Sequence, residues 1–356
     1  MSSQPEQRPE DNSENHPLNA GGASIPPEES PSNPEQSVRW TAEAGQIPPP
    51  RELYRESFPA LEHQGTQNQP DSEPPLFQSW SRPETPKIER IPNFGHLGIL
   101  ILLAICGLFC AGLVARLAFH WHLFGVSTLS QAANEIHFTL GTEGLFYLFT
   151  FAGCLLVFPI LWGKGFFAGL QWRGATALRY RGRLISAAGL CFVLALVNGM
   201  LLPGPANTPI DRIFRMPGAA WMLFAFGVTL APFFEEIAFR GFLLPALSTA
   251  FDWLAERAKG TPPHPLDENG HPQWSMPAMI IASIISSVLF ALMHGDQTGY
   301  SLGPFLLLVC VSLVLSWARL STRSLAASIL VHACYNFFLF SLMFLGTNGF
   351  KHLDNM

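Results

Sequence analysis

The chain has 356 residues, of which 48% are hydrophobic and 13% are charged. It has no phosphate-binding glycine loop and no basic, aromatic surface pattern, so we predict no soluble nucleotide chemistry and no nucleic acid partner. The first 92 residues hold 15 acidic side chains against seven basic ones, a net charge of −8, so the formal net charge of −5 leaves +3 for the rest of the chain.

The segment 1–92 also contains 17 of the 30 prolines and has no helical or strand periodicity. Such a segment buries too little apolar surface to offset its chain entropy. We therefore predict a disordered, acidic, proline-rich tail that carries no catalytic residue.

Six later stretches have the roughly 20 apolar residues that a helix needs to span a bilayer. They are residues 96–119, 143–163, 184–203, 276–294, 301–319 and 324–345. Another stretch, 217–251, is too long for one straight span and contains Pro232, which should kink or restart the helix. The sequence thus predicts an all-α, polytopic membrane bundle of seven or eight spans, with N-terminal transmembrane helices at 93–210 and a catalytic transmembrane domain at 211–350.

The orientation follows from the loop 164–183, which has five basic residues and no acidic one. An excess of Lys and Arg marks cytoplasmic loops. We therefore predict a multi-pass protein of the cell membrane with its N-terminal tail in the cytosol. All six cysteines lie in apolar stretches and are predicted to be small buried hydrophobic residues.

Charged residues are costly inside a bilayer, so those in the predicted spans need a reason. Glu236 and Arg240 are four residues apart, which places them on one helix face as an ion pair. Glu235 is turned about 100° away and lacks that local partner. One carboxylate is then predicted to be structural and the other to be reactive, unless both glutamates simply face water at a helix end near Pro232.

Two further polar groups follow on later spans. His294 comes four residues after Phe290 at the end of an apolar stretch, and His332 and Asn336 share a face of the last span. Considered alone, His294 could be a residue at the membrane interface, and His332 and Asn336 could form hydrogen bonds between helices. Taken together, they predict one polar site within the membrane.

These three motifs, in this order on successive hydrophobic segments, resemble the CAAX protease and bacteriocin-processing family, also called the CPBP or Abi family, which includes the CAAX prenyl endoprotease. The likeness covers residues 217–345. It implies an intramembrane endopeptidase in which Glu235 is the general base on a water and His294 binds that water. It also implies that His332 and Asn336 stabilise the oxyanion, with Glu236 and Arg240 as structural support.

A desolvated carboxylate is a stronger base, and donors in a low dielectric stabilise developing charge, so the residues themselves permit this chemistry. A metal site remains an alternative, because Glu235, His294 and His332 could be the ligands of a catalytic zinc. The cofactor is thus none or zinc, and the choice between a glutamate-type protease and a metalloendopeptidase stays open.

Two other functions remain open at this stage. Embedded Glu, Arg and His also occur in ion or solute transporters, and a non-enzymatic member of the family could act as a scaffold or immunity factor. The substrate is not encoded in these motifs. Peptides and proteins in the membrane, prenylated or membrane-anchored, are the candidates.

Overall fold

The computed structural model describes residues 90–202, 204, 208–216, 218–268 and 270–351. The predicted disorder of the segment 1–92 therefore lies outside the described residues, except at its last three positions. Arg90, Ile91 and Pro92 are buried, and Arg90 forms an ion pair of 2.7 Å with Glu256. The folded part thus begins before the predicted boundary.

Seven helical segments in the described residues are long and apolar enough to cross a membrane. Six are single helices: α1 (Phe94–His120), α3 (Ile136–Trp162), α6 (Arg181–Leu201), α11 (Met276–Met293), α12 (Leu302–Thr322) and α13 (Leu325–Gly346). The seventh is the long stretch Ala219–Lys259. The predicted all-α membrane bundle is confirmed, and the described residues provide seven spans and not eight.

Short helices lie in the connections between these spans. They are α2 (Leu129–Ala133), α4 (Phe166–Gly169), α5 (Gly174–Arg179) and α7 (Pro209–Phe214), with a 3-10 turn at Leu123–Gly125. The predicted segments 93–210 and 211–350 belong to one compact unit, so their division into two domains stays a prediction from the sequence.

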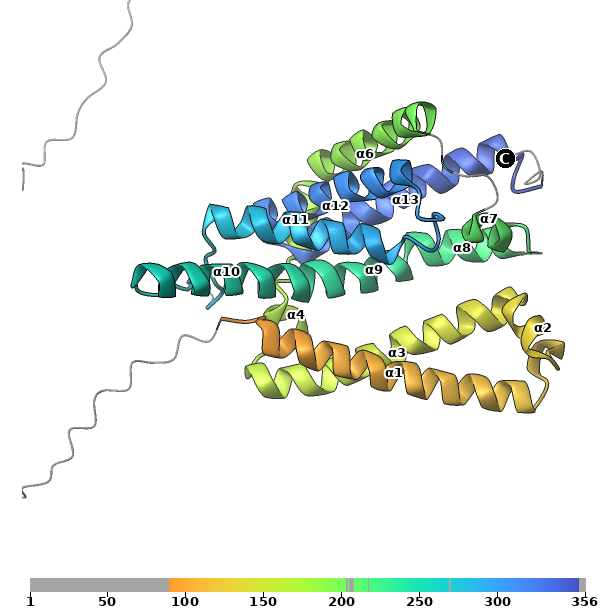
Figure 1. Cartoon of the computed structure of the whole chain (residues 1–356), viewed down its shortest axis with the longest axis horizontal. Helices are drawn as coiled ribbons and strands as arrows, with labels where there is room; N and C mark the ends of the chain where they lie inside the picture. The colour runs from red at the N-terminus through yellow and green to blue at the C-terminus, as the bar shows by residue number, and fades with distance from the viewer. Residues whose placement is uncertain (1–89, 203, 205–207, 217, 269, 352–356) are drawn as a thin grey trace, which may run out of the picture. The chain divides into compact units, whose positions relative to one another are not determined.

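The long stretch is built from four consecutive helical pieces that follow one another along nearly one direction (Figure 1). They are α8 (Ala219–Val228), α9 (Leu230–Glu236), a π-helix (Ile237–Leu243) and α10 (Leu244–Lys259). The first break falls at Thr229, with φ −117° and ψ −72°. Pro232 explains it, because a proline has no N–H to donate and its ring crowds the carbonyl four residues earlier, here that of Val228.

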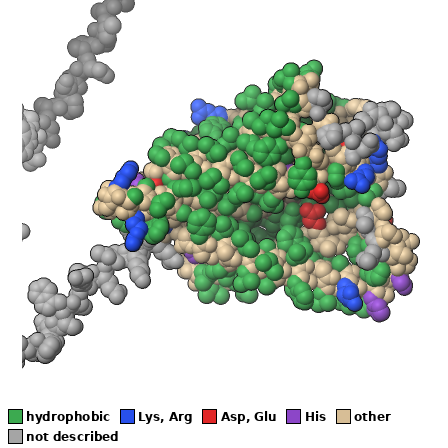
Figure 2. Space-filling view, viewed as in Figure 1, with side chains coloured by type: hydrophobic (Ala, Val, Ile, Leu, Met, Phe, Trp, Pro, Cys, Tyr) green, Lys and Arg blue, Asp and Glu red, His purple; other side chains and the backbone are tan. Residues whose placement is uncertain are grey.

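The outer surface of the bundle is strongly apolar. Ile160 and Met200 are 78% and 83% exposed, and hydrophobic side chains cover most of the face in Figure 2, with Lys and Arg near its ends. A surface of this kind is unfavourable in water and suits contact with lipid tails.

Two of the packing cores connect the helices that surround the site. One joins α6, α12 and α13 through buried side chains such as Leu184, Leu315 and Val331. The other joins the hairpin of α1 and α3, which lie side by side in Figure 1, to the π-helix through Phe158 and Phe242. The π-helix is therefore buried between the hairpin and the remaining helices, and this position bears on the site below.

Polar contacts bring the loop 164–183, predicted to be cytoplasmic, and two later loops together at one end of the molecule. Asp267 lies 3.9 Å from Arg173 and 3.7 Å from Arg323, while Glu256 is 2.6 Å from the imidazole of His264. The loop after α3, the loop after α10 and the turn before α13 therefore share this end. Its assignment to the cytosol, and that of the tail, stay predictions.

All six cysteines are free, but their burial differs from the prediction. Cys154 and Cys191 are buried, whereas Cys106, Cys110 and Cys310 are exposed. The prediction of burial was wrong for these three, because an apolar stretch does not reveal which helix face is turned outward to lipid.

Candidate active site

The predicted ion pair between Glu236 and Arg240 is present and fully buried. Arg240 Nη1 donates to Glu236 Oε1 at 2.9 Å, and both side chains are 0% exposed. Arg240 Nη2 donates to the carbonyl and the hydroxyl of Ser312 on α12, at 2.9 and 2.6 Å. Buried charges of this kind are tolerated only when they are paired and hydrogen-bonded, and this pair meets both conditions.

The π-helix around Arg240 needs its own support. Arg319 on α12 is buried and donates from Nε to the carbonyl oxygen of Arg240 at 3.2 Å. The Arg240 guanidinium also lies 4.8 Å from the ring centre of Phe290, within cation–π range. A π-helix departs from the regular α-helical hydrogen-bond pattern, and such turns are frequent at functional sites.

His332 links the buried pair to the second glutamate. Its Nδ1 is 3.0 Å from Glu236 Oε1, and its Nε2 is 3.8 Å from Glu235 Oε2. His294 Nε2 lies at the same distance, 3.8 Å, from Glu235 Oε2. Glu235, His294 and His332 therefore converge, although they come from three separate helical segments.

The carbonyl of Phe290 determines the orientation and tautomer of His294. His294 Nδ1 lies 2.8 Å from that oxygen. A carbonyl oxygen only accepts hydrogen bonds, so Nδ1 carries a proton, and when the imidazole is neutral Nε2 keeps a lone pair. This lone pair is on the ring edge that faces Glu235.

The start of α13 explains how His332 reaches Glu235. Regular antiparallel spans that begin at one level would leave His332 away from the other two residues. In the structure α13 begins at Leu325, and the side chain of Leu325 packs against Gly241 of the π-helix. A Cβ added to Gly241 would lie 3.6 Å from Leu325 Cδ2. α10 continues from the π-helix to Lys259. The first residue of α13 therefore lies deeper in the bundle than the end of α10, which brings His332 closer to Glu235.

Asn336 has a different neighbour. Its Nδ2 donates to the carbonyl oxygen of Gly227 at 2.7 Å, near the end of α8, where helix carbonyls lose their usual partners. α8 and α13 approach closely at this point, because a Cβ on Gly227 would lie 2.8 Å from the Phe340 ring. One N–H of Asn336 is thus engaged in an interhelical hydrogen bond, and its predicted oxyanion role stays a prediction.

The donors of Glu235, His294 and His332 are of the types that zinc accepts. Among the residues that the structure describes, however, no group of three or more His, Cys, Asp and Glu side chains is arranged so that it could hold a metal ion. We therefore derive no step through a metal.

Sequence reasoning found the five titratable groups and Asn336 but missed much of their support. Ser312 and the carbonyl partners carry no sequence signal. Arg319 did carry one, as the basic residue that ends the predicted span 301–319, but it was not selected as part of the site. In the structure it is 2% exposed.

The fold and the site define a multi-pass membrane protein with a carboxylate–imidazole cluster inside its helical bundle. Residues 217–338 match the family model described as "Type II CAAX prenyl endopeptidase Rce1-like". This part of the chain is thus similar to that protease family, in agreement with the resemblance in the sequence. The match covers about a third of the chain and includes every predicted site residue. No curated protein and no solved structure matches the chain.

Proposed function

We propose that this chain is an intramembrane endopeptidase in which Glu235 activates a water for attack on a peptide bond. The observation that supports this most is the pair of equal distances, 3.8 Å, from Glu235 Oε2 to His294 Nε2 and to His332 Nε2. This spacing is too long for a direct hydrogen bond. A water oxygen about 2.8 Å from each atom would bridge it.

The tautomer of His294 favours a particular orientation of that water. Both Glu235 Oε2 and the lone pair of His294 Nε2 accept hydrogen bonds, so the water would donate one hydrogen to each. Its oxygen lone pairs would then point away from the two acceptors and toward the substrate. Glu235 would be the general base and His294 would orient the water.

The reaction conserves atoms and charge. As the water oxygen bonds to the carbonyl carbon, one water proton passes to Glu235 and the carbonyl oxygen becomes an oxyanion. The carbon–nitrogen bond then breaks, and the proton on Glu235 passes to the leaving nitrogen. A carboxylic acid and an amine result, and Glu235 is again ionised.

His332 and Asn336 would stabilise the oxyanion. Because Glu236 Oε1 accepts from Nδ1 of His332, a protonated His332 would present Nε2–H to the site. Asn336 has a second amide hydrogen besides the one donated to Gly227. In a site with little water, such donors lower the barrier substantially.

Glu236 and Arg240 would act by positioning. Their buried pair fixes the π-helix that follows Glu235 and accepts the hydrogen bond that orients His332. The substrate would be a peptide or protein in or near the membrane, prenylated or membrane-anchored, in keeping with the family description.

The test is the Glu235→Gln variant, which keeps the shape of the side chain and removes the base. Membrane peptides from cells with the parent chain and from cells with the variant would be compared by mass spectrometry. We expect products that are present only with the parent chain, at equal amounts of inserted protein. Identical peptide profiles, or full complementation of a deletion by the variant, would contradict the proposal and favour a scaffold role.

A further inference from the structure

A second carboxylate lies within the membrane part, on the hairpin side of the bundle. Glu143 comes about two turns after the start of α3. It belongs to the helix face formed by Ile136, Leu140, Tyr147 and Phe151, whose spacings of three and four place them in one stripe. Ile136 and Leu140 are buried against α8, so Glu143 is the one charged residue of an inward-facing stripe.

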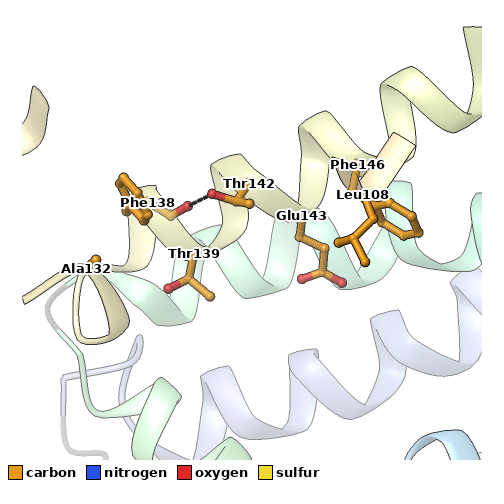
Figure 3. Close-up of a pocket in the computed structure, with 7 residues that line it drawn as sticks. All are labelled: Leu108, Ala132, Phe138, Thr139, Thr142, Glu143 and Phe146. Carbon is orange, nitrogen blue, oxygen red and sulfur yellow. Dashed lines mark hydrogen bonds between the residues drawn. The ribbon is translucent and has the colours of Figure 1, made fainter. Parts of the chain in front are cut away.

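Glu143 lines an open cavity of about 400 Å³. Figure 3 shows its carboxylate projecting from α3 beside the hydroxyl-bearing Thr139 and Thr142, with Leu108 of α1 and Phe146 nearby. The cavity is thus mainly apolar with one negatively charged group.

Aromatic contacts link Glu143 to the helix that carries Glu235. The Tyr147 hydroxyl donates to Glu143 Oε1 at 3.2 Å, and its ring stacks on Phe234 with centres 4.6 Å apart. Phe234 directly precedes Glu235 in the sequence. A substrate that binds at Glu235 and extends along Phe234 and Tyr147 would approach Glu143.

The single carboxylate in this mainly apolar cavity favours a positively charged ligand. Among the described residues Glu143 forms no ion pair, and Tyr147 is its hydrogen-bond partner. A carboxylate in apolar surroundings is stabilised by an opposite charge. A bare divalent ion would need about six oxygen ligands, which one carboxylate and two threonine hydroxyls do not supply. An anionic group would be repelled by both glutamates.

We propose that Glu143 is a specificity-determining residue that binds a basic side chain, Lys or Arg, of the substrate close to the scissile bond. The inference rests on the proposed endopeptidase function and deepens it by naming a feature of the substrate. The alkyl part of the basic side chain would contact Leu108 and Phe146, and its charged end would meet the Glu143 carboxylate.

The test measures binding, so that it does not depend on cleavage. The full chain with Glu235→Gln would be purified into lipid vesicles and titrated with fluorescent, apolar octapeptides with blocked ends. In each peptide one position carries Lys, and its partner peptide carries the uncharged isostere norleucine there. We expect the Lys peptide to bind about tenfold more tightly at one or two positions.

Adding Glu143→Gln should abolish this preference and leave the affinity for the norleucine peptides unchanged, which also shows that the cavity is intact. The matched control, Thr142→Val in the same cavity, should keep the preference. Equal affinity for Lys and norleucine peptides at every position, or a Lys preference that survives Glu143→Gln, would overturn the inference.

Failure of the proposed function gives a different result. In that case the chain with Glu235 intact would bind the Lys peptides through Glu143 but would not cut them, while the carboxylate–cation contact would still be supported.

Discussion

Glu235 and Glu236 are neighbours in the sequence but lie in two different regions of the bundle. Glu236 is 0% exposed and contacts Arg240 and His332, whereas Glu235 is 18% exposed and faces two imidazoles across 3.8 Å. The helix turns by about 100° between them. One carboxylate is therefore held in a fixed network, and the other is the one to which we assign the general-base role. The predictions below test this difference, from the largest expected effect to the smallest.

The Glu236→Ala and Arg240→Ala variants should damage folding as well as activity. Each leaves the partner charge buried and unpaired, which costs about 3–5 kcal/mol. Thermal unfolding in detergent would measure the loss. Replacing both residues together, with Glu236→Gln and Arg240→Met, should recover part of the stability, because no lone charge then remains. If either single variant unfolds like the parent chain, the pair does not support the site.

The His294→Ala variant should lower kcat by about 100-fold while the unfolding temperature stays close to that of the parent chain. The side chain is partly exposed at the end of α11, and its hydrogen bond is to the Phe290 carbonyl of its own segment. Steady-state cleavage of a substrate peptide would measure kcat and KM separately. Unchanged kcat would remove His294 from the reaction.

The Asn336→Ala variant should have two smaller effects. Loss of the hydrogen bond to the Gly227 carbonyl should cost about 1–3 kcal/mol of stability. Loss of an oxyanion donor should also lower kcat more than it changes KM. Reduced stability with an unchanged kcat would assign Asn336 to helix packing alone.

The stability of the folded chain should also depend on pH through a residue at the polar end, independently of the site. Burial, together with the positive charges of Lys164, Arg173 and Arg319, lowers the pKa of His271 to about 4, against a partial opposing effect of Asp267. The unfolded chain then binds more protons between pH 6.5 and 4, so stability should fall as the pH drops through this range. His271→Gln should flatten this pH dependence in unfolding measurements. An unaltered pH dependence would exclude His271 as its source.

The sequence predicted the features that depend on local spacing. The length of the apolar stretches predicted the spans, and Pro232 predicted that the helix restarts, as it does at Thr229. The separation of four residues predicted the ion pair of Glu236 with Arg240. These features follow from the geometry of a single helix, so one sequence is enough to find them.

The features that the sequence could not supply depend on contacts between distant segments. The π-helix at Ile237–Leu243 has no composition signal, and the deep start of α13 depends on packing against Gly241. Asn336 has a backbone carbonyl as its partner, which no residue type reveals. The spacing of residues along the sequence therefore identified the candidate site residues, but the distances between their side chains depend on how the helices pack.

The most direct measurement of the central claim compares Glu235→Gln with Glu236→Gln in purified protein, with kcat and the unfolding temperature recorded for each. We expect Glu235→Gln to lower kcat by about 1,000-fold or more and to unfold like the parent chain. Glu236→Gln should unfold at a clearly lower temperature. Normal cleavage by Glu235→Gln, or equal loss of stability in both variants, would contradict the separation of roles between the two carboxylates.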